Sequence, residues 1–129
     1  MPTLSDPKLT ITVDTGEQAT VTASVDVFFS EEEKQLIAFL PFINYLVTCK
    51  IWGADPVFDD GLFQLGNATI RDDQDDLTFS SVVSKEALDE DNDGGDDEIY
   101  AEFTCVPGDS PLDLKSATPV KSLEVTGSF

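Results

Sequence analysis

Apolar and polar residues alternate along several short stretches of this chain. In residues 9–13 and 19–29 apolar side chains occupy the odd positions, while Thr, Ser and Asp fill most even positions. Such alternation is typical of β-strands with one buried face, because successive side chains point to opposite faces of a sheet. Residues 14–18 between them contain Asp and Gly, which favour turns. The pattern therefore predicts an antiparallel hairpin with a continuous apolar face.

A different pattern begins at Ser30. Ser30 and Glu33 have the spacing of a capping box, in which each side chain bonds the other residue's backbone N–H at a helix N-terminus. Apolar residues follow at positions 36, 37 and 40, and Pro41 ends the segment. This predicts one short helix near residues 31–40, bridging two sheets.

Further stretches with strand character cover residues 45–52, 62–70, 77–83, 99–106 and 120–126. The alternation in residues 77–83 is broken, which predicts a β-bulge there. Short strands separated by Gly, Pro and Asp indicate an all-β protein. We expect a single antiparallel β-sandwich of about seven or eight strands in residues 1–129, with residues 1–7 as a flexible N-terminal tail.

The charge is strongly negative, with 26 acidic and 7 basic residues and a net charge of −19. Direct binding to nucleic acid needs clusters of Lys and Arg to neutralise phosphates, so that class is excluded. An anionic membrane is disfavoured for the same reason, unless calcium bridges the two surfaces. Three interpretations of the charge remain open: sites for cations, mimicry of nucleic acid, or a salt-adapted surface.

The residue types disfavour an enzyme. The chain has no His, no glycine-rich phosphate loop and no nucleophile-elbow sequence. Cys49 and Cys105 lie on the apolar side of their predicted strands, which indicates two buried thiols, or a cross-strand disulfide if the strands are neighbours. With no export signal and no apolar run long enough for a membrane span, we expect a cytoplasmic protein.

The candidate chemistry lies in residues 88–103, where seven acidic residues fall within ten positions. Asp89, Asp91 and Asp93 alternate, Gly94 follows, and Asp97 occupies the ninth position counted from Asp89. Carboxylates about 4 Å apart repel by about 1 kcal/mol per pair even in water. Calcium takes six to eight oxygen ligands and would relieve this repulsion. The simpler alternative is an acidic hairpin tip that only aids solubility.

The DxDxDGxxD pattern resembles the calcium loops of EF-hand proteins, and more closely those that integrin-type propellers place between two β-strands. The twelfth position, a bidentate Glu in EF-hands, is Tyr100, so we expect a strand after the loop instead of a helix. The resemblance implies four side-chain ligands and one backbone carbonyl: Asp89, Asp91, Asp93, Asp97 and the carbonyl of Gly95.

Three of these residues, Asp89, Asp91 and Asp97, also match the DxDxxxxxD spacing in the third calcium loop of the phospholipid-binding sandwich domains of protein kinase C and synaptotagmin. In that family an earlier loop adds aspartates to the same ion cluster. The resemblance therefore implies a second candidate metal loop in this chain, containing Asp55, Asp59 and Asp60. The lysine-rich strand that binds lipid in that family has no counterpart here.

A third acidic run, at positions 72, 73, 75 and 76, has no recognisable ligand order and is interpreted as a solvated turn. Taken together, the sequence favours a non-enzymatic, calcium-binding β-sandwich that engages a protein or glycan partner through its acidic loops. The alternatives are an acidic nucleic-acid mimic, or a salt-adapted structural protein without a specific metal site.

Overall fold

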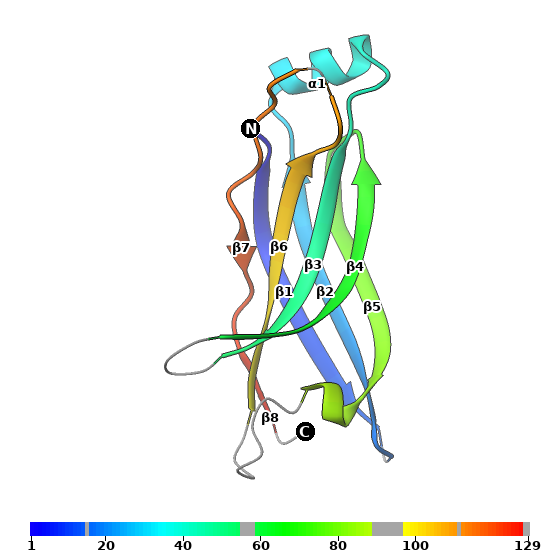
Figure 1. The fold of residues 1–129 in the computed structure, drawn as a ribbon, viewed down its shortest axis with the longest axis vertical. Coiled ribbons are helices and arrows are strands. Elements are labelled where there is room, and N and C mark those ends of the chain that lie inside the picture. The colour runs from blue at the N-terminus through cyan, green and yellow to red at the C-terminus, as the bar shows by residue number, and fades with distance from the viewer. Residues whose placement is uncertain (15, 55–58, 89–96, 111, 128–129) are drawn as a thin grey trace.

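The computed structural model describes residues 1–14, 16–54, 59–88, 97–110 and 112–127 of the chain (Figure 1). In these residues eight strands form two antiparallel sheets, with one α-helix at one end of the long axis. The predicted all-β sandwich is therefore confirmed. Within the same residues, the structure has no helix both long enough and apolar enough to cross a membrane.

The first sheet has the order β1-β2-β5 and consists of β1 (Thr3–Val13), β2 (Gln18–Phe28) and β5 (Gln74–Ser84). β1 and β2 form the predicted hairpin. The expected N-terminal tail is wrong for residues 3–7, which belong to β1. Leu4 is buried in the core and pairs with Val27, so burial of its side chain fixes this segment.

The second sheet has the order β4-β3-β6-β7, and a further short strand pairs with β6. The expected strand over residues 120–126 is two short strands. Residues 123 and 124 leave the pairing with β6, whereas the Ser122 N–H still donates to the Ala101 carbonyl at 2.9 Å. The strands of this sheet are β3 (Tyr45–Gly53), β4 (Asp60–Ile70), β6 (Asp97–Pro107), β7 (Val120–Lys121) and β8 (Val125–Gly127).

The bulges lie elsewhere than predicted. β5 pairs with β2 in continuous register from residue 77 to residue 84. The sequence alternation breaks there because Ser81 lies on the inner side and Val82, 59% exposed, on the outer side. The register shifts occur instead between residues 74 and 77 at the start of β5, between residues 5 and 8 of β1, and in β4, where Leu62 and Leu65 have no partner in β3. The alternation of apolar and polar residues in the sequence reflects side-chain polarity only. Because a small Ser is tolerated on either face of a sheet, a break in the alternation does not by itself show a β-bulge.

The core lies between the sheets and is built from the inward positions of β2, β3 and β6. Phe103 is its largest fully buried side chain. Cys49 and Cys105 are both buried and free. In the register of β3 and β6, Cys49 lies opposite Phe103 and Cys105 opposite Val47, so the thiols are not directly paired across the strands. Burial raises the pKa of Cys49 to about 12 and that of Cys105 to about 11.

Helix α1 (Glu31–Phe39) connects the two sheets, as predicted, and Ser30 and Glu33 form its capping box. The last turn of the helix contains no basic residue. Arg71, from the turn between β4 and β5, instead donates a hydrogen bond to the Ile37 carbonyl at 2.6 Å. A cation at this end also compensates the negative end of the helix dipole.

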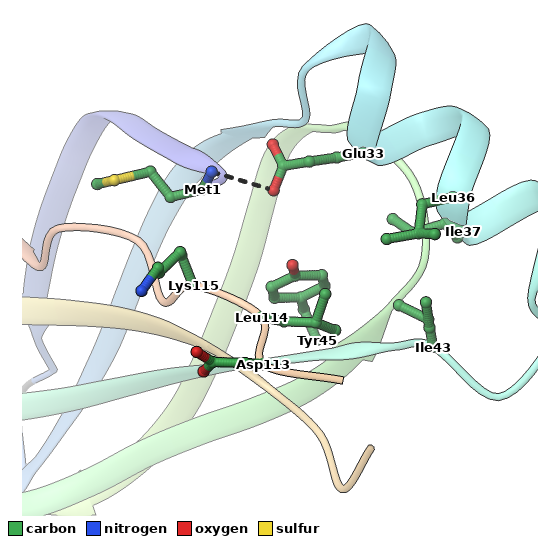
Figure 2. A pocket seen from close by; sticks show the side chains of 9 residues that line it. All are labelled: Met1, Glu33, Leu36, Ile37, Ile43, Tyr45, Asp113, Leu114 and Lys115. Atoms are coloured by element: carbon green, nitrogen blue, oxygen red, sulfur yellow. Dashed lines mark ion pairs between the residues drawn. The ribbon is translucent and has the colours of Figure 1, made fainter. Parts of the chain in front are cut away.

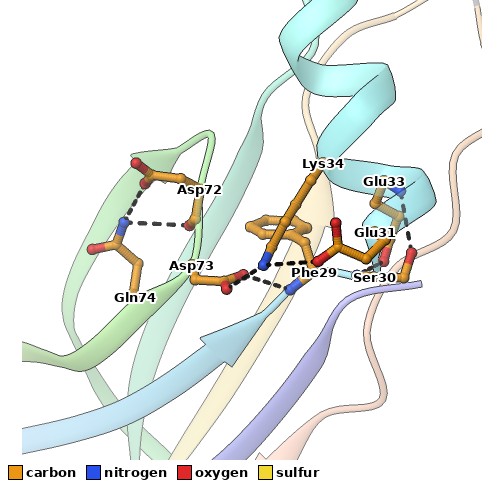
Figure 3. Close-up of polar contacts among 8 residues, drawn as sticks. All are labelled: Phe29, Ser30, Glu31, Glu33, Lys34, Asp72, Asp73 and Gln74. Carbon is orange, nitrogen blue, oxygen red and sulfur yellow. Dashed lines mark hydrogen bonds and ion pairs between the residues drawn. The ribbon is translucent and has the colours of Figure 1, made fainter.

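Asp73, in the same turn, binds the start of the helix (Figure 3). One of its oxygens accepts a hydrogen bond from the Phe29 backbone N–H at 2.8 Å, and the other forms an ion pair with the Lys34 ammonium at 2.8 Å. These contacts lower the pKa of Asp73, with the Lys34 hydrogen bond contributing most. The interpretation of this acidic run as a merely solvated turn is therefore wrong for Asp73.

Candidate functional site

The end of β3 and the starts of β4 and β6, which flank the acidic segments predicted to bind calcium, lie toward the end of the sandwich opposite α1 (Figure 1). β6 begins there at Asp97, and the β3–β4 hairpin approaches it. Asp59, Asp60 and Asp97 are among the described residues. The other predicted ligands lie outside the described residues: Asp55, Asp89, Asp91, Asp93 and Gly95.

Asp97 is the first residue of β6 and is only 2% exposed. The strand alternates regularly from there, so Asp97 shares its inward face with Ile99 and Ala101. The predicted strand with Ile99, Ala101, Phe103 and Cys105 on one face is confirmed. An ionised carboxylate at such a position is costly unless donors or a cation surround it. Asp97 thus places a carboxyl group on the inward face at the start of β6.

The second acidic loop is tied to the same strand through two contacts. The Ala54 N–H donates to the Glu98 carbonyl at 2.8 Å, extending the ladder between β3 and β6 by one bond. The Tyr100 hydroxyl donates to an Asp59 carboxylate oxygen at 2.6 Å. Burial of the Tyr100 side chain, and then this hydrogen bond, raise the pKa of its hydroxyl. Asp59 thereby anchors the end of the β3–β4 connection to β6.

The described carboxylates do not converge on one point. Asp97 and Tyr100 are three residues apart on a regular strand, so their side chains leave β6 on opposite faces. Asp59 binds the Tyr100 hydroxyl, on the outer side, while Asp97 faces inward. Among residues the structure describes, no group of three or more Asp, Glu or Cys side chains could hold a metal ion.

Two lysines cover aromatic rings beside Asp59, an arrangement not predicted from the sequence. The Lys50 ammonium lies 4.2 Å from the centre of the Trp52 ring, and that of Lys121 lies 5.2 Å from the Tyr100 ring. Trp52 and Tyr100 are cross-strand neighbours in β3 and β6. A side chain at Gly61 would collide with Lys50, since an added Cβ would lie 2.8 Å from its ammonium. The glycine therefore allows the Lys50–Trp52 contact.

A hint of this cluster was present in the sequence, because Lys50 and Trp52 are two positions apart in a strand and must share a face. Its partner residues on β6 and β7 could not be assigned without the strand order. The contacts are of the cation–π type, worth about 0.5–1 kcal/mol at exposed sites. They lie on the outer face of the second sheet, where Tyr100 also binds Asp59.

A separate cavity of about 180 Å³ lies under α1, at the other end of the sandwich (Figure 2). Its walls include Leu36, Ile37 and Ile43, and Glu33 forms an ion pair with the Met1 amino group at 3.4 Å. Burial and the nearby Glu33 carboxylate raise the pKa of the Tyr45 hydroxyl. The volume is below the 300–1,000 Å³ usual for ligand sites, and the lining contains no nucleophile paired with a base.

No family model, curated protein or solved structure matches this chain. The function must therefore be inferred from the chain's own residues. Of the two ends of the sandwich, the acidic one combines a ligand-like sequence pattern with a buried carboxylate.

Proposed function

We propose that this protein is a non-enzymatic calcium-binding β-sandwich that acts as an interaction module through its acidic loop end. The proposed ligands are the carboxylates of Asp89, Asp91, Asp93 and Asp97 and the carbonyl of Gly95. Calcium accepts carboxylate and backbone oxygens at about 2.3–2.6 Å, and this ligand set supplies both kinds.

The observation that carries the proposal is the burial of Asp97 at the first position of β6. A solubilising acidic tip would expose its carboxylates, because water is their cheapest partner. Here the last acidic residue of the DxDxDGxxD pattern is fixed by strand pairing with Gly127 and removed from solvent. One ligand would thus be preorganised, which lowers the entropy lost when the ion binds.

The second candidate loop has a supporting role in this proposal. The Tyr100–Asp59 and Ala54–Glu98 bonds connect the β3–β4 end to the strand that begins with Asp97. Calcium binding beside Asp97 would therefore also affect the β3–β4 end. A protein or glycan partner would contact these two loops together, in the presence of calcium.

Calorimetric titration with calcium, together with the melting temperature, tests the proposal. Binding to the native state alone raises the free energy of unfolding by RT ln(1 + [Ca²⁺]/Kd), about 2.7 kcal/mol at a hundredfold excess over Kd. Asp91→Asn should remove both the heat and the thermal shift. Asp75→Asn is the matched control, since it deletes the same charge from an exposed position, the second residue of β5. Absence of heat and of any shift at millimolar calcium would refute calcium binding.

Two alternative functions give different results in the same assays. A salt-adapted protein would be stabilised by KCl and by calcium equally at matched ionic strength. A nucleic-acid mimic would capture a basic DNA-binding protein in a manner that salt abolishes and a chelator leaves unchanged. Calcium binding instead predicts stabilisation that a chelator reverses.

A further inference from the structure

The cavity under α1 is larger than the gaps that normally remain between packed side chains (Figure 2). Protein interiors contain few voids bigger than a water molecule, and a void weakens the fold in proportion to its volume. At about 180 Å³ the cavity is too small for a drug-sized ligand. It exceeds, however, the roughly 150 Å³ at which an apolar protein cavity takes up benzene. Its size therefore suits a molecule of about six to eight non-hydrogen atoms.

Four apolar side chains from three separate segments form the walls of this cavity. They are Leu36 and Ile37 of α1, Ile43 before β3, and Leu114 between β6 and β7. Ile37 and Ile43 are almost completely buried, whereas Leu36 and Leu114 are half-buried and pack against the core. An apolar ligand would be stabilised there by removing its own surface and that of the walls from water.

Two polar side chains of the cavity, Tyr45 and Glu33, limit the charge that a ligand can carry. Both Glu33 oxygens already have partners, since one accepts the Ser30 N–H at 3.0 Å and the other pairs with the Met1 amino group. A ligand therefore needs no positive charge to compensate this carboxylate, and a negative charge would be repelled by it. Tyr45 is buried, and its hydroxyl points toward Glu33 (Figure 2). Its oxygen can also accept a hydrogen bond from a ligand hydroxyl.

The cavity is reached from solvent on one side. Met1, Asp113 and Lys115 also line it, and all three are exposed, whereas the other lining residues are buried or half-buried. These three residues therefore form the mouth. A small molecule can enter between them without disturbing the strand pairing of either sheet, because none of them is part of a strand.

We propose that this cavity is a binding site for a small uncharged molecule with an apolar ring, of the size of benzene or phenol. The apolar walls hold the ring, and the Tyr45 hydroxyl bonds a hydroxyl of the ligand where the ligand has one. Because the walls belong both to α1 and to the segment before β7, an occupied cavity also ties these two parts together. The site lies at the α1 end of the sandwich, away from the start of β6, so it does not depend on calcium binding.

Titration with benzene and with phenol, followed by amide NMR spectra and by the melting temperature, tests the proposal. Both compounds should bind saturably at millimolar concentration, raise the melting temperature and shift the amide signals of residues around the cavity. Benzoate has the same ring with a negative charge and should not bind. Leu114→Phe should abolish binding, because the larger side chain fills the cavity. Leu112→Phe is the matched control, since Leu112 is 41% exposed and lies outside the cavity walls.

Tyr45→Phe provides a second measurement, which stands even where Leu114→Phe fails to fold. It should weaken phenol binding about fivefold, the effect of one lost hydrogen bond, and leave benzene binding unchanged. The proposal is overturned by the absence of saturable binding to the unmodified protein, or by NMR shifts centred away from the cavity. It is equally overturned by unchanged binding to folded Leu114→Phe, by loss of binding to Leu112→Phe, or by benzoate binding as tightly as phenol. Equal effects of Tyr45→Phe on benzene and phenol would overturn the role of the hydroxyl.

Discussion

The contacts of Asp73 predict how the helix is held on the sandwich. Asp73→Ala removes the acceptor of the partly buried Phe29 N–H and the ion pair with Lys34, each at 2.8 Å. A hydrogen bond to a charged group contributes about 1.5–3 kcal/mol when its donor has no alternative partner. Water can reach this site because the Asp73 side chain is about one third exposed, so we expect a loss of about 1–2 kcal/mol.

Asp73→Asn separates the two contacts. Its amide oxygen can still accept the Phe29 N–H, whereas the ion pair with Lys34 is lost. Because both charged side chains are more than a third exposed, that pair contributes little. We therefore expect Asp73→Asn to destabilise the protein clearly less than Asp73→Ala. Asp75→Ala, at an exposed position in the same acidic run, controls for the loss of one negative charge.

Urea unfolding followed by the fluorescence of Trp52, the only tryptophan, measures these differences. The pH dependence gives a second check. The pKa of Asp73 is lowered in the folded state, so its contribution to stability is present above the unfolded pKa and disappears as pH falls through the folded pKa. The difference between the unmodified protein and Asp73→Asn should vanish in that acidic range. Equal losses for Asp73→Asn and Asp73→Ala would refute the role of the Phe29 bond.

Two further predictions concern the helix cap and the thiols. Ser30→Ala removes half of the capping box and should lower the free energy of unfolding by about 1 kcal/mol in urea. Ser30→Asp should preserve most of the stability. An unchanged urea midpoint for Ser30→Ala would contradict the capping role. Cys49 and Cys105 should resist a thiol reagent at mildly alkaline pH and react fully in urea, because burial raises their pKa values to about 12 and 11. Rapid labelling of the native protein would show that these strands open.

The sequence was informative where the signal is local. The reciprocal spacing of Ser30 and Glu33 predicted the helix start, because both bonds form within one turn. Alternation predicted β6 and its inward residues, because successive side chains point to opposite faces of a strand. The same alternation failed at residues 81 and 82, where the polar Ser81 faces inward and the apolar Val82 faces outward.

The candidate site was only partly predictable for the same reason. The spacing of acidic residues singled out Asp97, but its burial depends on its pairing with β8, some 30 positions further along the chain. The bond from Tyr100 to Asp59 joins residues 41 positions apart. No local pattern predicts such a bond, because it requires β4, β3 and β6 to be neighbours in that order.

By itself the sequence determined the element types, the apolar face of each strand and the acidic character of the loops, since these follow from side-chain chemistry over a few residues. Only the tertiary structure decided which strands pair, which edges stay open, and which aspartates are buried or bound. The physical reason is that backbone hydrogen bonding is the same for every residue, so partner choice is settled by how distant apolar faces pack together. Asp73 and Asp97 both belong to acidic runs in the sequence. The packing of distant segments gives Asp73 its bond to the Phe29 N–H and buries Asp97.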